Sequence, residues 1–180
     1  MGKRLLNLEA IQEAHCDYTT GTSKQFRVLR NIGEVAPYFP INEPILCFGS
    51  GDGFEVRVWE LLGYAAIGCE LSSKKREVAL SYGVETVSNL EACIGMRRNV
   101  YCAHTIEHVE DRDITILRLA SISISTICFI FPIEPNGSMN PSHLSPIESL
   151  DDVDILDMRT ALKYERWNDE REGIVIFKGD

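Results

Sequence analysis

The stretch ILCFGSGDGFE, residues 45–55, decides the fold of this chain of 180 residues. The apolar run Ile45 to Phe48 predicts a short buried strand. The glycines at 49, 51 and 53 predict a sharp turn that opens a helix, because glycine adopts backbone conformations that other residues avoid. Without a Cβ, such a turn also leaves its backbone amides open to a ligand.

A carboxylate follows the turn at a suitable distance. The run Gly68-Cys69-Glu70-Leu71-Ser72 ends the next apolar segment, and Glu70 lies 21 positions after Gly49 (70 − 49 = 21). An acid at the tip of the second strand of an α/β sheet is placed to hold the two hydroxyls of a ribose. The glycine turn and Glu70 together predict a site for a cofactor that contains a nucleoside.

The remaining sequence alternates strands and helices, which predicts a mostly parallel sheet with right-handed crossovers. We expect a helical N-terminal cap or lid over residues 1–43, with helices at 5–14 and 25–36, and one α/β folding unit over 44–180. In that unit we expect strands at 44–48, 65–70, 84–87, 99–103 and 126–131, helices at 53–62, 72–82 and 112–121, a long loop at 132–146, a short helix at 147–153, and a closing antiparallel hairpin of strands at 155–167 and 173–178.

Composition narrows the class of protein. With 44% hydrophobic residues the chain can bury a core, and a net charge of −9 without a long basic stripe disfavours nucleic acid as a partner. The six cysteines form no CxxC pair, which suits reduced thiols and a cytoplasmic location. The apolar stretch 114–131 contains Arg118 and ends at Pro132, so we expect a helix followed by a strand there, and no membrane span.

The spacing of the glycines separates nucleotide-binding classes. A dinucleotide fingerprint requires G-x-G-x-x-G, but Phe54 occupies the position of its third glycine, which disfavours a nicotinamide-dependent oxidoreductase. A G-x-x-x-x-G-K-[ST] phosphate loop is also absent from the sequence. The pattern present is G-x-G-x-G.

At five places the sequence resembles the class I S-adenosylmethionine-dependent methyltransferases, especially the small branch related to ubiquinone-type O-methyltransferases. The resemblance covers residues 44–178. It is carried by five segments: Leu46 to Gly53, Leu62 to Ser72, Ser88 to Glu91, His104 to Asp111, and His143 to Leu150. The fourth of these is similar to the family's "hvLEHv-D" segment. It implies a Rossmann-like α/β fold with seven strands in the order 3-2-1-4-5-7-6, an antiparallel last strand, and helices on both faces of the sheet.

The resemblance also implies a cofactor, S-adenosylmethionine, and residues that hold it. Glycines 49, 51 and 53 with Ser50 would line its methionine part, Glu70 and the adjacent Leu71 its ribose, Asn89 its adenine edge, and His104 the floor of the site. The chain departs from the family at two of these places. Cys47 stands where the family commonly has an acid that reaches the cofactor's amino group, and Asn89 stands where it usually has an aspartate.

Two histidines are candidates for catalysis. His104 or His108 would deprotonate an acceptor, because imidazole titrates near neutral pH. A packing role is the alternative for each of these two histidines. His143, in the late loop, could face the acceptor, but a solvent-exposed loop position is favoured for it, and amide capping is favoured over a role as a base for Glu107. We expect no metal, although His104, Glu107 and His108 also match the H-x-x-E-H signature of a zinc hydrolase.

The expected activity is methyl transfer to an unidentified small-molecule or protein acceptor. The alternative from a different class is a methyltransferase-like binding or scaffold protein without catalysis, which the substitution at Cys47 would favour. The sequence does not fix an oligomeric state.

Overall fold

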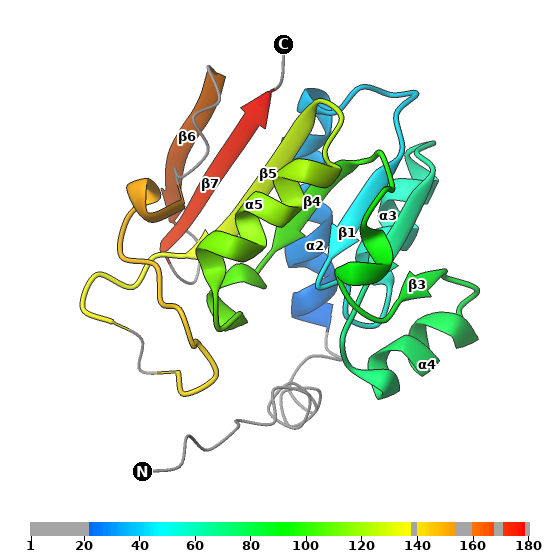
Figure 1. Cartoon of the computed structure of the whole chain (residues 1–180), viewed down its shortest axis with the longest axis horizontal. Coiled ribbons are helices and arrows are strands. Elements are labelled where there is room, and N and C mark those ends of the chain that lie inside the picture. Colours follow the sequence, from blue (N-terminus) through cyan, green and yellow to red (C-terminus); the bar gives the residue numbers. More distant parts are fainter. Residues whose placement is uncertain (1–21, 138–139, 154–159, 168–170, 179–180) are drawn as a thin grey trace.

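Seven strands form a single sheet in the order β3-β2-β1-β4-β5-β7-β6, which is the order implied by the resemblance to the methyltransferases (Figure 1). The computed structural model describes residues 22–137, 140–153, 160–167 and 171–178. The strands are β1 (Ile45–Phe48), β2 (Ala66–Cys69), β3 (Thr86–Val87), β4 (Asn99–Ala103), β5 (Thr126–Pro132), β6 (Thr160–Trp167) and β7 (Arg171–Lys178).

Burial on both faces explains why the central strands are apolar almost throughout. Every residue of β4 and of β5 is buried, which is the pattern expected of parallel strands covered on both sides. The pairs β1–β2, β1–β4, β2–β3 and β4–β5 are parallel, whereas β7 runs antiparallel to β5 and to β6. The predicted fold class, with its antiparallel last strand, is therefore confirmed.

Helices cover both faces of the sheet (Figure 1). The α-helices are α2 (Thr22–Val35), α3 (Phe54–Leu61), α4 (Ser73–Ser81) and α5 (Arg112–Ile122), and the short 3-10 helices are η2 (Ala36–Tyr38), η3 (Glu91–Cys93), η4 (Ile106–His108) and η5 (Leu150–Val153). Buried side chains of α2 and α3 share one core cluster, and those of α5 share the other. The Ser72 side chain caps α4, and that of Asp111 caps α5.

The N-terminal part of the described chain belongs to this layered arrangement. Val28, Ile32 and Val35 of α2 are buried in the same cluster as strand residues such as Tyr101 and Ile174. Helix α2 therefore covers one face of the sheet. The helix expected at 5–14 lies outside the described residues, so the division of the chain at residue 43 stays a prediction.

Two elements differ from expectation in length or type. The third strand has two residues, Thr86–Val87, and the short helix expected at 147–153 is a 3-10 turn over Leu150–Val153. The first part of the strand expected at 155–167 lies outside the described residues, which resume with Thr160.

The apolar stretch 114–131 divides into most of α5 and most of β5. Of the helices that the structure describes, none has the length and apolar character needed to cross a bilayer.

Candidate functional site

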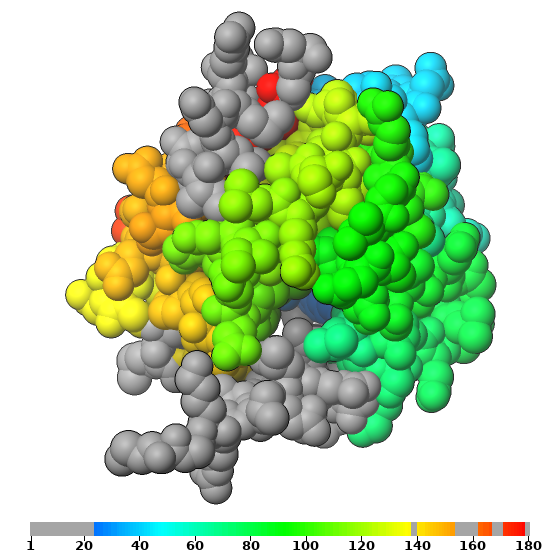
Figure 2. All heavy atoms as spheres, in the orientation of Figure 1, coloured from blue at the N-terminus to red at the C-terminus, as the bar shows by residue number. Residues whose placement is uncertain are grey.

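A cleft of about 610 Å³ opens at the carboxyl ends of β1, β2 and β4. Its walls come from the glycine turn, the segments after β2 and β4, the N-terminal half of α2, and the loop after β5. In Figure 2 the hollow lies near the centre of the view, where blue atoms of α2 show between green segments. This volume is within the usual range for ligand pockets, roughly 300–1,000 Å³.

The glycine turn lies under the segment that follows β4. Gly49 has a φ of 75°, and a Cβ built on it would lie 2.1 Å from the Thr105 hydroxyl oxygen, so no larger residue fits there. Gly49 and Ser50 both donate backbone N–H groups to the Cys69 carbonyl, at 2.8 and 3.2 Å, which ties the turn to the end of β2. Gly49, Ser50 and Gly51 line the cleft.

Gly53 has a different place from the one predicted. It is the residue that precedes α3, with a φ of 84°, and it is absent from the lining of the cleft. A Cβ at this position would lie 2.9 Å from the side chains of both Ala79 and Val84. Gly53 therefore lets α3 pack closely against α4 and the chain that follows α4.

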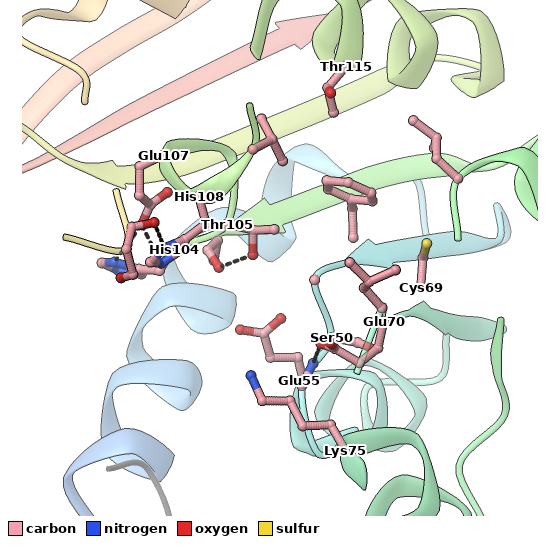
Figure 3. Close-up of a pocket in the computed structure, with 18 of the residues that line it drawn as sticks. Ser50, Glu55, Cys69, Glu70, Lys75, His104, Thr105, Glu107, His108 and Thr115 are labelled. Atoms are coloured by element: carbon pink, nitrogen blue, oxygen red, sulfur yellow. Dashed lines mark hydrogen bonds and ion pairs between the residues drawn. The ribbon is translucent and has the colours of Figure 1, made fainter. Parts of the chain in front are cut away.

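Glu70 points toward the glycine turn and joins it to α4 (Figure 3). One carboxylate oxygen accepts the Gly51 N–H at 2.8 Å, and the other accepts the Ser72 N–H at 2.9 Å. The side chain is buried and lines the cleft. Because a carboxylate has about four acceptor positions, these two bonds leave capacity for further donors from the cleft.

The remaining predicted cofactor residues also line the cleft. Leu71 follows Glu70 and is partly exposed, and Asn89 lies in the segment after β3. The Asn89 side-chain oxygen accepts the Ala92 N–H at 2.9 Å and so caps η3. Its amide nitrogen is then the group that remains to contact a ligand.

Glu55 is a lining residue that the sequence analysis missed. Burial raises its pKa to about 8, despite the opposing effect of Lys24 and Arg27 on α2. Its Oε2 atom is buried without a hydrogen-bond partner among the described residues, as is the Ser50 hydroxyl. The Glu55 charge also contributes, after burial itself, to the raised pKa of Cys47. In the sequence, Glu55 was distinguished only as the acid in the first turn of α3.

His104 stands directly after β4 and has a φ of 50°, a left-handed conformation that is uncommon outside glycine. Its Nε2 lies 2.9 Å from a carboxylate oxygen of Glu172 on β7. Burial raises the pKa of Glu172, but the hydrogen bond and charge of His104, followed by those of Arg166, outweigh burial and lower this pKa to about 2. His104 is thus fixed by an ionic contact that connects the cleft to the hairpin.

Glu107, His108 and His143 meet at the same end of the cleft, and Figure 3 shows Glu107 and His108 there beside His104. The rings of His108 and His143 are 4.7 Å apart. His143 was expected on a solvent-exposed loop, which is wrong, since its side chain is 11% exposed and bonds to Glu134 at 2.9 Å. The zinc-hydrolase motif needs an α-helix over 104–108, whereas only Ile106–His108 form a 3-10 turn.

Comparison with known proteins identifies the fold. No protein-family model matches the chain, and no curated protein matches its sequence. Solved structures do match. An S-adenosylmethionine-dependent methyltransferase of Archaeoglobus fulgidus aligns with 86% of this chain and 94% of its own, at a TM-score of 0.70 and 15% identity.

Two further structures were determined with ligands. The magnesium protoporphyrin IX methyltransferase of Synechocystis, with bound S-adenosylmethionine, aligns with 99% of this chain and 87% of its own, at a TM-score of 0.68 and 13% identity. An N-methyltransferase of Haemonchus contortus, in complex with phosphomonomethylethanolamine and S-adenosylhomocysteine, aligns with 88% of this chain and 53% of its own, at a TM-score of 0.64 and 11% identity. The chain therefore has the fold of the S-adenosylmethionine-dependent methyltransferases.

Proposed function

We propose that this protein transfers a methyl group from S-adenosylmethionine to an acceptor held in the same cleft. One observation carries the proposal: the glycine turn after β1 and the Glu70 carboxylate after β2 are bonded to each other and face one cavity. In sheets of this kind the ligand binds outside the carboxyl ends of the strands, where the order of the strands reverses. Here that point lies between β1 and β4.

The residues present fit the cofactor. The turn has no side chain at Gly49 or Gly51, and the buried Ser50 hydroxyl has no hydrogen-bond partner among the described residues. These three residues would hold the methionine part, and Glu70, with Leu71 beside it, would accept hydrogen bonds from the ribose hydroxyls. Asn89 would meet the adenine edge through its amide nitrogen. When bound, S-adenosylmethionine supplies a methyl group already activated on a sulfonium sulfur.

Glu55 supplies the carboxylate for the cofactor's amino group that Cys47, at the family's usual position for this acid, does not provide. Cys47 is fully buried in the sheet, and burial raises its pKa well above that of an ordinary thiol, so it offers no negative charge. The Glu55 carboxylate lies close enough to raise that pKa further and faces the cleft (Figure 3). It would therefore bind the cofactor's ammonium group from the first turn of α3 rather than from the end of β1.

The acceptor would lie at the end of the cleft near His104 and His108. Because Nε2 of His104 is hydrogen-bonded to the Glu172 carboxylate, this histidine is suited to forming the floor of the site. His108 is the better candidate for a base. Its Nδ1 lies 2.9 Å from the Ser142 carbonyl oxygen, which can only accept, so Nδ1 carries the proton and Nε2 has the lone pair.

Calorimetric titration with S-adenosylhomocysteine tests the proposal directly. We expect one binding event per chain, and a Glu70→Ala variant should bind at least tenfold more weakly, since a hydrogen bond to a charged group contributes about 1.5–3 kcal/mol. Glu77→Ala is the matched control, because Glu77 is exposed on α4 outside the cleft. Absence of binding heat from the wild-type chain would favour a non-catalytic scaffold, and an unchanged affinity in Glu70→Ala would reject the ribose assignment.

A further inference from the structure

Three side chains at the acceptor end of the cleft have the composition and spacing of a metal site. Glu107, His108 and His143 each offer one ligand atom, and these atoms all lie within 4.8 Å of one another. Glu107 and His108 come from η4, whereas His143 comes from the loop after β5. We propose that these three residues bind a divalent transition-metal ion.

Hydrogen bonds set the same tautomer in both imidazoles. Nδ1 of His108 donates to the Ser142 carbonyl at 2.9 Å, and Nδ1 of His143 donates to the Glu134 carboxylate at 2.9 Å. In each ring, Nε2 is then the nitrogen with a lone pair. Histidines that bind metals through one nitrogen generally donate the other N–H to a carboxylate or a backbone carbonyl, which is the arrangement present twice here.

The contacts of Asn140 support this tautomer of His143 independently. The Asn140 side-chain oxygen accepts the backbone N–H and the hydroxyl of Ser142, at 3.1 and 2.8 Å, which fixes the orientation of its amide. Its nitrogen consequently faces Nε2 of His143, at 3.1 Å, and donates to it. A bound ion would replace this amide as the partner of the Nε2 lone pair, with a rotation of the Asn140 side chain.

Glu107 completes the set with a carboxylate from the interior. Its side chain is only 1% exposed, and one carboxylate oxygen lies 3.8 Å from Nε2 of His108. Two imidazole nitrogens and one carboxylate oxygen suit Zn²⁺, Co²⁺ or Fe²⁺ better than Mg²⁺ or Ca²⁺, which prefer oxygen ligands. Three protein ligands also leave coordination positions open to the cleft, as in catalytic rather than structural metal sites.

This site gives the acceptor end a specific role, which rests on the function proposed above. An oxygen atom of the acceptor would occupy an open coordination position and be held beside the methyl donor. On this inference Nε2 of His108 binds the ion instead of accepting a proton. The triad also differs from the zinc signature in the sequence, because His143 takes the place of His104, whose Nε2 is engaged by Glu172.

Titration with Co²⁺ tests the site without any assay of activity. The full chain is stripped with a chelator and titrated with Co²⁺, with visible absorption and calorimetry as readouts. We expect one ion per chain in the wild type and at least a tenfold loss of affinity in His143→Ala and in Glu107→Gln. Glu148→Gln is the control and should keep one ion, because Glu148 is exposed and does not belong to the triad.

Each outcome bears on one proposal only. No uptake of Co²⁺ by the wild type, or equal uptake by wild type and His143→Ala, would overturn the metal site, and thermal unfolding of each variant shows whether it is folded. Binding of S-adenosylhomocysteine is measured separately on the same samples. A chain that binds Co²⁺ but not S-adenosylhomocysteine keeps the metal site and loses the proposed function, and the reverse result loses only the metal site.

Discussion

The two ends of the cleft are built in different ways. The end at the glycine turn is made by short segments that directly follow β1 and β2, and backbone amides supply most of its fixed contacts. The end at His108 is made by side chains from η4, the loop after β5, and β7, which are far apart in the sequence. The first end depends on backbone shape, and the second depends on tertiary packing and paired charges. Variants at the two ends should therefore lose stability or binding for different physical reasons.

The largest effect is expected from Gly49→Ala at the glycine end. The new Cβ would overlap the Thr105 side chain at 2.1 Å and would hold a left-handed φ. Left-handed backbone costs roughly 1–2 kcal/mol and overpacking roughly 1–3 kcal/mol, so we expect a loss of about 2–5 kcal/mol in unfolding free energy, together with the loss of S-adenosylhomocysteine binding. Urea unfolding and calorimetry measure the two effects.

Gly33→Ala provides the control for this prediction. Gly33 lies inside α2, and a Cβ there would have no neighbour within 4 Å. Alanine is favoured over glycine within helices, so this variant should be neutral or more stable by about 0.5–1 kcal/mol. If both variants were equally stable, backbone shape would not define the glycine end.

The same contrast explains what the sequence could reveal. The glycine end was predictable because its parts have fixed spacings, 49 to 70, within regular strands and helices that hydrophobic patterns locate. The packing role of Gly53 was not predicted, because a glycine needed for close packing cannot be distinguished in sequence from one that faces a ligand. Glu55 was missed because the direction of a side chain in a first helical turn depends on how the helix packs.

The histidine end could be predicted only in part. The resemblance pointed to His104 and His108, but not to their partners, since Glu172 and Ser142 reach them through the folding of the hairpin and of the loop. His143 was expected in solvent because loops generally lie at the surface. Its burial follows from contacts of the loop with η4, such as that of Ser145 N–H with the Glu107 carbonyl, which no local pattern indicates.

The second prediction concerns the charge that supports the histidine end. Glu172 is buried between His104 and Arg166, and its pKa is lowered to about 2. A lowered carboxylate pKa stabilises the fold above the ordinary value near 4.5, and this stabilisation disappears as the pH falls toward 2. Glu172→Gln should therefore reduce the unfolding free energy by about 3 kcal/mol at pH 7, and the gap from wild type should narrow at pH 3.

Glu165→Gln is the matched control for Glu172→Gln. Glu165 pairs with Arg171 on the same hairpin, but both side chains are about one-third exposed. Exposed pairs contribute roughly 0.2–1 kcal/mol, so the control should change stability little at either pH. If both variants lost the same unfolding free energy, the buried charge of Glu172 would contribute no more to stability than the exposed charge of Glu165.

The smallest effect on stability, and the one that separates binding from folding, is expected from Glu55→Gln. Because the pKa of Glu55 is raised to about 8, its carboxylate costs the fold stability progressively as the pH rises from about 4.5 to 8. Removing the charge should leave stability unchanged at pH 4.5 and raise it by about 1 kcal/mol at pH 8, an estimate discounted for solvent access to the cleft. Thermal unfolding across this pH range measures the change.

The affinity for S-adenosylhomocysteine should change in the opposite direction to stability when Glu55 is replaced. If Glu55 holds the cofactor's ammonium group, wild-type affinity for S-adenosylhomocysteine should rise about tenfold from pH 6 to pH 7.5, because a larger fraction of the Glu55 side chain is ionised at the higher pH. Glu55→Gln should bind more weakly at pH 7.5 and lose this dependence. A variant that is both more stable and equally able to bind would mean that the cleft needs no acid near position 47. A variant that is more stable and weaker in binding would show that Glu55 is kept for the ligand at the expense of the fold.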